Sequence, residues 1–229
     1  MKVLIIIPAY NESENIETVV DALIRDCPLY DYIIIDDGSS DNTESLCNRK
    51  KYNYIKHPIN LGLACSFRTG MKYAFKYGYD CALQFDGDGQ HDAQYIAAMV
   101  KVMQEQRADI VIGSRYVNKK KNIRLRELGN SIISFLIYLT TGTTIHDTTS
   151  GMRLFNSEII EKYAREINYS PEPDTIAYLL RLGYSVKEIP VIMREREFGE
   201  SYLNWWNGVK YMVNICTSIV FIQWFRRKK

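Results

Sequence analysis

The chain has 229 residues, of which 46% are apolar and 24% charged, and this is enough for one globular domain with a full core. Its net charge is +2, but residues 226–229 are all basic, which leaves 25 basic against 27 acidic residues elsewhere. This balance argues against a nucleic-acid-binding protein. The five cysteines form no CxxC pair, and only five apolar residues separate Lys2 from Pro8, too few for a signal peptide. We expect an intracellular protein with reduced cysteines.

The first half of the chain alternates between apolar runs and amphipathic segments. Residues 3–7 form a continuous apolar run, typical of a strand covered on both faces. Asn11 and Glu14 resemble a capping box, which predicts a helix that ends near Cys27. The pattern continues with strands at residues 32–35, 52–56, 81–85 and 109–113 and helices from about residue 43, around residues 64–75 and at residues 93–106.

The helix around residues 64–75 is expected to point five apolar side chains inward: Ala64, Phe67, Met71, Ala74 and Phe75. Strands that alternate with helices at this spacing predict an α/β fold, an open twisted and mostly parallel sheet flanked by helices.

The second half is less regular. Three lysines at residues 119–121, followed by Arg124 and Arg126, indicate either a solvated loop or a loop that gathers phosphates. Residues 132–139 are strongly apolar and predict a helix that is buried or faces a membrane. Residues 185–193 predict a late strand, and Pro190 favours the edge of the sheet.

Polar clusters follow three of the predicted strands, at residues 8–12, 36–37 and 86–90. Ligands of open α/β sheets bind beyond the carboxyl ends of the strands, so these clusters are expected to meet at one edge. Neither a GxGxxG motif after the first strand nor a P-loop motif occurs, which disfavours dinucleotide oxidoreductases and P-loop enzymes.

The cluster at residues 86–91, with the sequence Asp-Gly-Asp-Gly-Gln-His, suits a metal-bound diphosphate. In an extended segment Asp86 and Asp88 point to the same side, and Gln90 adds a neutral oxygen that hard cations accept. The two glycines allow a polyanion to approach the backbone. An ordinary surface turn is the alternative, and the recurrence of carboxylates after successive strands favours the metal site, with Mg²⁺ or Mn²⁺.

Together these motifs resemble family 2 glycosyltransferases of the GT-A fold, in particular the branch of dolichyl-phosphate mannose synthase and polyprenyl-phosphate glycosyltransferases. The resemblance covers about residues 1–202, and we expect residues 203–229 to form a separate C-terminal amphipathic helix. Seven motifs in the same order carry it, at residues 8–12, 36–39, 60–62, 86–91, 113–115, 147–153 and 196–201.

The resemblance implies roles for individual residues. It implies that the nucleotide-sugar donor, of the UDP or GDP type, is held by Pro8, Tyr10, Glu12, Asp36, Asp37, Gly62 and Ser201. It implies that the metal is held by Asp86, Asp88 and Gln90, and that Arg115, Arg126 and Arg196 contact phosphates. Tyr202 stands where that branch usually has lysine, which leaves the type of acceptor open.

The acceptor decides whether the reaction needs a general base. A phosphate monoester is largely a dianion at neutral pH and attacks without losing a proton, whereas a sugar hydroxyl needs a positioned base. Glu172 and Asp174, each flanked by proline, are the candidates, although the same prolines suit a plain rigid turn. Asp147 ranks behind them as a supporting or acceptor-side group.

The C-terminal segment carries all three tryptophans of the chain, Trp205, Trp206 and Trp224, near the two ends of an apolar stretch. Only 15 residues separate Lys210 from Arg226, whereas a spanning helix needs about 20 apolar residues. We therefore expect a helix that lies in the membrane interface and places residues 226–229 on anionic lipid. A last helix packed on the catalytic domain is the alternative.

These observations predict an inverting, metal-dependent glycosyltransferase that moves a sugar from a nucleotide-sugar to a polyprenyl phosphate. We expect it on the cytoplasmic side of the cell membrane as a peripheral protein, with a small membrane protein or a second copy as a further possible partner. A transferase that acts on a hydroxyl of a lipid-linked cell-surface glycan is the second hypothesis. A non-catalytic nucleotide-sugar-binding subunit is the third.

Overall fold

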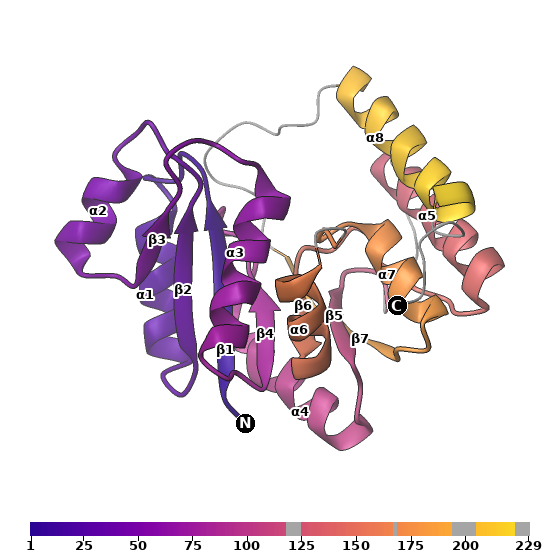
Figure 1. Cartoon of the computed structure of the whole chain (residues 1–229), viewed down its shortest axis with the longest axis horizontal. Helices are drawn as coiled ribbons and strands as arrows, with labels where there is room; N and C mark the ends of the chain where they lie inside the picture. Colours follow the sequence, from indigo (N-terminus) through magenta and orange to yellow (C-terminus); the bar gives the residue numbers. More distant parts are fainter. Residues whose placement is uncertain (118–124, 167–168, 194–204, 223–229) are drawn as a thin grey trace.

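The computed structural model describes residues 1–117, 125–166, 169–193 and 205–222 (Figure 1). Within these residues, the centre of the molecule is a seven-stranded sheet with the order β3-β2-β1-β4-β6-β5-β7. The strands are β1 (Val3–Ala9), β2 (Asp31–Asp36), β3 (Tyr54–Lys56), β4 (Cys81–Gln84), β5 (Ile110–Ser114), β6 (Arg153–Asn156) and β7 (Val186–Pro190). Among the strands of the described residues, β6 alone runs antiparallel to its neighbours, so the predicted mostly parallel sheet is confirmed.

Strand β1 shows why the sheet is covered on both faces. Its five consecutive apolar residues are all buried and alternate between two hydrophobic clusters, because successive side chains of a strand point to opposite faces. Val3, Ile5 and Ile7 belong to the cluster that includes α1 (Ile16–Asp26), α2 (Thr43–Lys50) and α4 (Ile96–Gln106). Leu4 and Ile6 belong to the cluster on the other face.

The other face is covered by helices from both halves of the chain. Helix α3 (Leu63–Lys76) lies against β1 so closely that a Cβ on Gly70 would lie 2.3 Å from a methyl carbon of Ile6. The remaining helices on this side are α5 (Leu125–Thr141), α6 (Ser157–Arg165), α7 (Pro173–Arg181) and α8 (Trp205–Thr217), and α8 continues into a π-helical segment, Ser218–Ile222. Figure 1 shows α5 and α8 side by side at one end of the molecule, where α7 joins them.

Several elements of the structure differ from those predicted from the sequence. Strand β6 and helices α6 and α7 were not predicted. Strand β6 has only four residues and begins with the charged Arg153, so it carries no apolar pattern. The expected capping box does not form: Asn11 has a φ of 56°, and its side chain accepts a hydrogen bond from the Ser40 N–H instead of capping α1. Pro190 does lie in an edge strand, as expected.

Two of the five side chains expected to point inward from α3 are exposed. Phe67, Met71 and Ala74 are buried, whereas Ala64 and Phe75 are not. At about 100° per residue, positions 64 and 75 lie roughly 90° or more from the centre of the buried face. The apolar spacing therefore identified the helix correctly but made its buried face too wide.

Candidate functional site

The carboxyl edge of the sheet brings the predicted polar clusters together. The chain leaves β1 toward β2 and β3 on one side and returns to β4 on the other, so the order of the strands reverses between β1 and β4. Asn11 N–H donates to Ser39 Oγ at 2.9 Å, which joins the loops after β1 and β2. A Cβ on Gly87 would lie 3.2 Å from the carbonyl oxygen of Pro8, which places the loop after β4 beside them. Ligand sites of open α/β sheets form at such switch points.

Two buried carboxylates with different roles stand at the end of β2, where Asp36 is the last residue of the strand and Asp37 begins the loop that follows. Asp36 is completely buried, and its Oδ1 accepts the Ser39 N–H at 2.9 Å. This hydrogen bond stabilises the first turn of the loop after β2. Asp37 accepts hydrogen bonds from the N–H groups of Leu61 and Gly62 and from His57. Burial alone would raise the pKa of Asp37, but these hydrogen bonds outweigh it and lower that pKa.

Pro8, near the end of β1, and Tyr10 and Glu12, on the loop that follows it, are half-buried. The Glu12 N–H donates to Thr43 Oγ1 at 3.1 Å, and the Glu12 carboxylate accepts from Asn15 at 2.8 Å. The loop after β1 is thereby tied both to the start of α2 and to the residue before α1. All three residues lie at the edge where the donor was expected.

The motif at residues 86–91 forms a turn rather than the extended segment that the sequence suggested. Strand β4 ends at Gln84, and the turn is held by a hydrogen bond of 3.1 Å from the Gln90 N–H to Asp88 Oδ1. Asp88 is buried, whereas a third of the Asp86 side chain is exposed. The period-2 argument for a shared ion is therefore wrong in its geometry, although both carboxylates lie in one short turn at the expected edge.

His91 supports this turn. Its Nδ1 accepts the Asp86 N–H at 3.0 Å, and its ring packs edge-on against Phe85 with 5.3 Å between the ring centres. A Cβ on Gly151 would lie 2.2 Å from Asp86 Oδ2, so the loop before β6 presses against the same carboxylate. The motifs at residues 86–91 and 147–153 thus share one contact.

The described part of the chain contains no group of three or more His, Cys, Asp or Glu side chains that could hold a metal ion by themselves. Mg²⁺ and related hard cations commonly use one or two carboxylates and complete their coordination with substrate phosphates and water. Two carboxylates and one amide oxygen, from Asp86, Asp88 and Gln90, fit that kind of site.

Arg115 and Asp147 form a charged pair beyond the end of β5. The guanidinium donates two hydrogen bonds of 2.7 Å to the two oxygens of Asp147, and the Arg115 N–H adds a third at 2.9 Å. Asp147 is completely buried, whereas a fifth of the Arg115 side chain is exposed. Burial opposes the charge of the arginine, but the hydrogen bonds and charge of Asp147 outweigh it and raise the Arg115 pKa. Asp147 therefore holds Arg115 in place, and its expected supporting or acceptor-side role remains a prediction.

The two candidate bases both contact the C-terminal helical segment. Tyr211 of α8 donates to Glu172 at 2.5 Å, and Ser218 donates to Asp174 at 2.6 Å. Burial raises the pKa of Glu172, although the hydrogen bond from Tyr211 opposes this shift. Neither Tyr211 nor Ser218 was singled out from the sequence, since both lie in a stretch that was interpreted as an interfacial helix or a last packed helix without roles for its polar residues.

Arg153 links the two loops on this side of the site. Its side chain is buried and donates to the carbonyl oxygens of Pro171 at 2.8 Å and Thr148 at 2.7 Å. The turn that carries Glu172 is thereby held next to the loop that carries Asp147. The arginine was visible in the sequence as the last residue of the motif at 147–153, but only as part of the resemblance.

Three of the expected phosphate or donor contacts are not described at the level of side chains. Arg196 and Ser201 lie outside the described residues, and Arg126 is described only as part of the backbone of α5. Their roles remain predictions.

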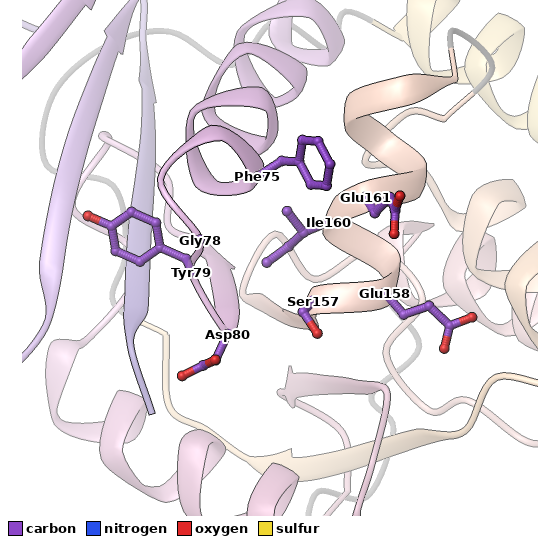
Figure 2. Close-up of a pocket in the computed structure, with 8 residues that line it drawn as sticks. All are labelled: Phe75, Gly78, Tyr79, Asp80, Ser157, Glu158, Ile160 and Glu161. Atoms are coloured by element: carbon purple, nitrogen blue, oxygen red, sulfur yellow. The ribbon is translucent and has the colours of Figure 1, made fainter.

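A pocket of about 460 Å³ lies at the opposite edge of the sheet, between the end of α3 and the start of α6. Figure 2 shows Phe75 and Ile160 on its two sides, with carboxylates from Asp80, Glu158 and Glu161 around it. Each carboxylate already has a partner: Asp80 accepts the Lys2 N–H, Glu158 the Tyr184 hydroxyl, and Glu161 pairs with Arg165. None of the motif residues lines this pocket, so we place the site at the carboxyl edge.

An open α/β sheet whose polar loops converge at the reversal of strand order defines a protein of the doubly wound α/β class, with its ligand site at this edge. A family model described as glycosyl transferase family 2 matches residues 4–164, and the chain belongs to this family. The fold is the GT-A fold, and the protein is a glycosyltransferase, as expected from the sequence.

Curated relatives belong to the polyprenyl-phosphate branch. Polyprenol monophosphomannose synthase of Mycolicibacterium smegmatis is 28% identical over 220 residues, which cover 89% of this chain and 81% of the relative. The UDP-N-acetylglucosamine–dolichyl-phosphate N-acetylglucosaminyltransferase of Methanococcus voltae is 31% identical over 212 residues, which cover 82% and 84%. The predicted resemblance to this branch is confirmed.

Solved structures agree in fold. A mannosyltransferase of Pyrobaculum calidifontis in complex with GDP-Man and Mn²⁺ has a TM-score of 0.69 at 19% identity, and the match covers 100% of this chain and 65% of that one. Glucosyl-3-phosphoglycerate synthase of Mycobacterium tuberculosis, in complex with Mn²⁺, UDP-glucose and phosphoglyceric acid, has a TM-score of 0.71 at 12% identity, and the match covers 100% and 81%.

Because the ion pair between Arg115 and Asp147 is mostly buried, Asp147→Asn should lower the free energy of unfolding strongly. The substitution leaves the Arg115 charge with a neutral partner in a mostly buried position, which typically costs about 3 kcal/mol or more. Glu161→Gln, which breaks an exposed pair with Arg165, is the matched control and should cost less than about 1 kcal/mol. Urea denaturation measures both values, and equal costs would contradict a structural role for the pair.

Glu172→Gln should stabilise the protein in a pH-dependent way. Since the folded protein raises the pKa of Glu172, ionisation opposes folding, and wild-type stability falls as pH rises through that value. Below about pH 4.3, the usual glutamate pKa, the carboxyl group is neutral in both states and the effect vanishes. The stability of Glu172→Gln relative to wild type should therefore increase from pH 4 to pH 8 in urea denaturation.

Tyr211→Phe is the companion variant for this experiment. It removes the hydrogen bond that lowers the Glu172 pKa, so the loss of stability with rising pH should be steeper than in wild type. A pH-independent difference between Glu172→Gln and wild type would show that burial of this carboxylate does not oppose its charge.

Proposed function

We propose that this glycosyltransferase transfers a sugar, with inversion at the anomeric carbon, from a nucleotide-diphosphate sugar to a polyprenyl phosphate at the cytoplasmic face of a membrane. The observation that carries the proposal is the meeting of the loops after β1, β2 and β4 at the reversal of strand order. The relatives support the acceptor class, because their names specify polyprenol or dolichyl phosphate.

The donor end of the site follows from the residues at the β1–β4 edge. Pro8 of β1 and the loop residues Tyr10, Glu12 and Asp37 would hold the nucleoside, and Asp86, Asp88 and Gln90 would hold Mg²⁺ or Mn²⁺. When bound, such a cation stabilises the charge that develops on the diphosphate leaving group. The similar structures named above contain Mn²⁺, which supports a divalent metal.

The acceptor phosphate needs an anchoring cation rather than a base. Its oxygen forms the new bond to the anomeric carbon while the bond to the donor diphosphate breaks, and a dianionic phosphate loses no proton in this step. Arg115 is suited to orient a phosphate group, because Asp147 fixes its guanidinium and part of its side chain stays exposed. Attack opposite the leaving group explains the proposed inversion.

Transfer to a hydroxyl of a lipid-linked glycan is the second candidate, and the raised pKa of Glu172 favours it. A carboxylate with a raised pKa is a better base near neutral pH. However, Tyr211 and Ser218 already engage Glu172 and Asp174, and the relatives are named for phosphate acceptors. We therefore rank this candidate second.

The test is an assay of the full-length protein with polyprenyl phosphate, a panel of UDP- and GDP-sugars, and Mg²⁺ or Mn²⁺. We expect one donor to yield a glycolipid and free nucleoside diphosphate. Asp88→Asn should lower the rate by about 10²-fold or more, because charge stabilisation of the leaving group is lost. Asp92→Asn is a matched control in the same loop, since asparagine can still accept the Gln94 N–H.

Two outcomes decide between the acceptors. Metal-dependent consumption of the donor without a glycolipid product would reject a polyprenyl phosphate acceptor. Glu172→Gln should retain transfer to the phosphate within about threefold, whereas loss of the base in a hydroxyl-directed enzyme would cost about 10²- to 10⁴-fold. Donor binding, measured separately, should be unchanged in this variant.

Membrane contact is proposed for helices α5 and α8. Neither these nor any other helix of the described residues is long and apolar enough to cross a membrane. Each of the two has a buried side and an exposed apolar side: Ile133 and Ile137 of α5 and Ile215 of α8 are buried. The exposed side chains are Leu128, Ile132, Phe135 and Leu139 of α5, Val209 and Val213 of α8, and Phe221 of the π-helical segment.

The contacts of α8 bear on the predicted division at residue 203, which remains a prediction. Helix α8 packs on α5 so closely that a Cβ on Gly129 would lie 3.2 Å from Met212 Sδ, and it holds Glu172 through Tyr211. These contacts support the alternative interpretation of the sequence, in which the last helix packs on the catalytic domain, for the buried side of α8. A membrane or a partner would contact only the exposed side.

The double variant Phe135→Glu, Phe221→Glu should weaken binding to anionic lipid vesicles. Burial of one phenylalanine contributes about 1.5–3 kcal/mol, so the loss should be at least about tenfold. Leu29→Glu, at a residue that is 90% exposed between α1 and β2, is the matched control and should bind like wild type. Vesicle flotation measures binding, and unchanged flotation of the double variant would reject this contact.

A further inference from the structure

A chain of hydrogen bonds runs from the loop after β2 into helix α3. His57 Nδ1 lies 2.7 Å from Asp37 Oδ1, and His57 Nε2 lies 2.9 Å from Thr69 Oγ1. His57 follows β3 directly, and both His57 and Asp37 are buried, at 7% and 3% exposure. An ionised carboxylate can only accept, so Nδ1 carries the hydrogen toward Asp37. The sequence drew no attention to this histidine, because its partners are 20 and 12 positions away.

The same carboxylate organises the loop that precedes α3. Asp37 Oδ1 also accepts the Leu61 N–H at 3.0 Å, and Oδ2 accepts the Gly62 N–H at 2.7 Å. Gly38 has a φ of +71°, and a Cβ there would lie 2.5 Å from the carbonyl carbon of Ile59. The loops after β2 and β3 are therefore in direct backbone contact, and Asp37 joins them.

His57 differs from the two backbone donors because it is a side chain that reaches Asp37 from the end of β3. The two backbone N–H groups bind Asp37 only if residues 57–62 already have the right conformation. His57 is anchored from two sides, by the end of β3 and by Thr69 of α3, so its hold on the carboxylate does not depend on the conformation of residues 60–62. Removing it leaves a buried carboxylate with one donor fewer.

We propose that His57 is a positioning residue for the donor nucleotide: it holds Asp37 and residues 57–62 in the conformation that receives the nucleoside. The inference rests on the proposed function, since it takes the loop after β2 as part of the donor site. His57 acts through Asp37 and contacts no reacting atom. Its loss should therefore raise the KM for the nucleotide-sugar and leave kcat nearly unchanged.

The order Asp-His-Thr also resembles the arrangement that activates a hydroxyl nucleophile. Here Thr69 Oγ1 is in addition 3.0 Å from the carbonyl oxygen of Cys65, one helical turn earlier, to which it donates. Such a bond commits the hydroxyl to the helix backbone. The transfer reaction itself supplies its nucleophile with the acceptor, so the positioning role explains the geometry with fewer assumptions.

Two substitutions of similar size distinguish the hydrogen bond of His57 Nδ1 from that of Nε2. The amide nitrogen of asparagine lies near the position of Nδ1 and can still donate to Asp37, whereas that of glutamine reaches toward Nε2 and Thr69. His57→Asn should therefore keep the KM for the nucleotide-sugar within about threefold of wild type. His57→Gln should raise it about tenfold or more, with kcat within about twofold, as expected for the loss of a hydrogen bond to a charged group.

Binding of UDP and GDP with Mn²⁺, followed by calorimetry, and the melting temperature complete the experiment. The inference is overturned if His57→Gln binds the preferred diphosphate as tightly as wild type, or if both variants lose stability equally while KM stays constant. If neither variant folds, Thr69→Val, which removes only the far anchor, must raise KM, and an unchanged KM would reject the inference. Failure of wild type to bind either diphosphate would instead reject the proposed function.

Discussion

The position of β1 between β2 and β4 is the constraint on which the site depends. All three strands are parallel, so the loops that follow them emerge at the same edge, and the reversal of strand order separates the helices that would otherwise cover it. The burial of β1 on both faces makes this arrangement rigid. This strand order brings together the half-buried residues Pro8, Tyr10 and Glu12 and the carboxylates of residues 36, 37, 86 and 88.

A second set of contacts connects the proposed acceptor side of the site with α8 and the π-helical segment that follows it. Arg153 holds the turn at residues 171–174 against the loop at residues 147–151, and Tyr211 and Ser218 hold its two carboxylates from the other side. The surface proposed to meet the membrane and the turn proposed to lie near the acceptor are thus parts of one packed unit. A lipid-bound acceptor would approach the enzyme from the side where α5 and α8 expose apolar residues.

Much of the fold was predictable because its signals are local. Continuous apolar runs identified β1, β2, β4 and β5, helical spacing identified α1 and α3, and Pro190 placed β7 at an edge. Strand β6 was missed, since four residues beginning with arginine carry no periodic signal, and its antiparallel direction depends on the neighbours β4 and β5. The buried face of α3 was drawn too wide because packing against β1 selects only part of an apolar surface.

For the site, the sequence alone determined which residue types stand after which strands, and this was enough for the family, the fold and the class of reaction. Only the tertiary structure decided how these residues are paired. Asp147 binds Arg115, Glu172 binds Tyr211, and His57 binds Asp37, across 32, 39 and 20 positions of the chain. The physical reason is that a hydrogen bond requires two groups within about 3 Å, and sequence spacing sets that distance only within one helix or strand.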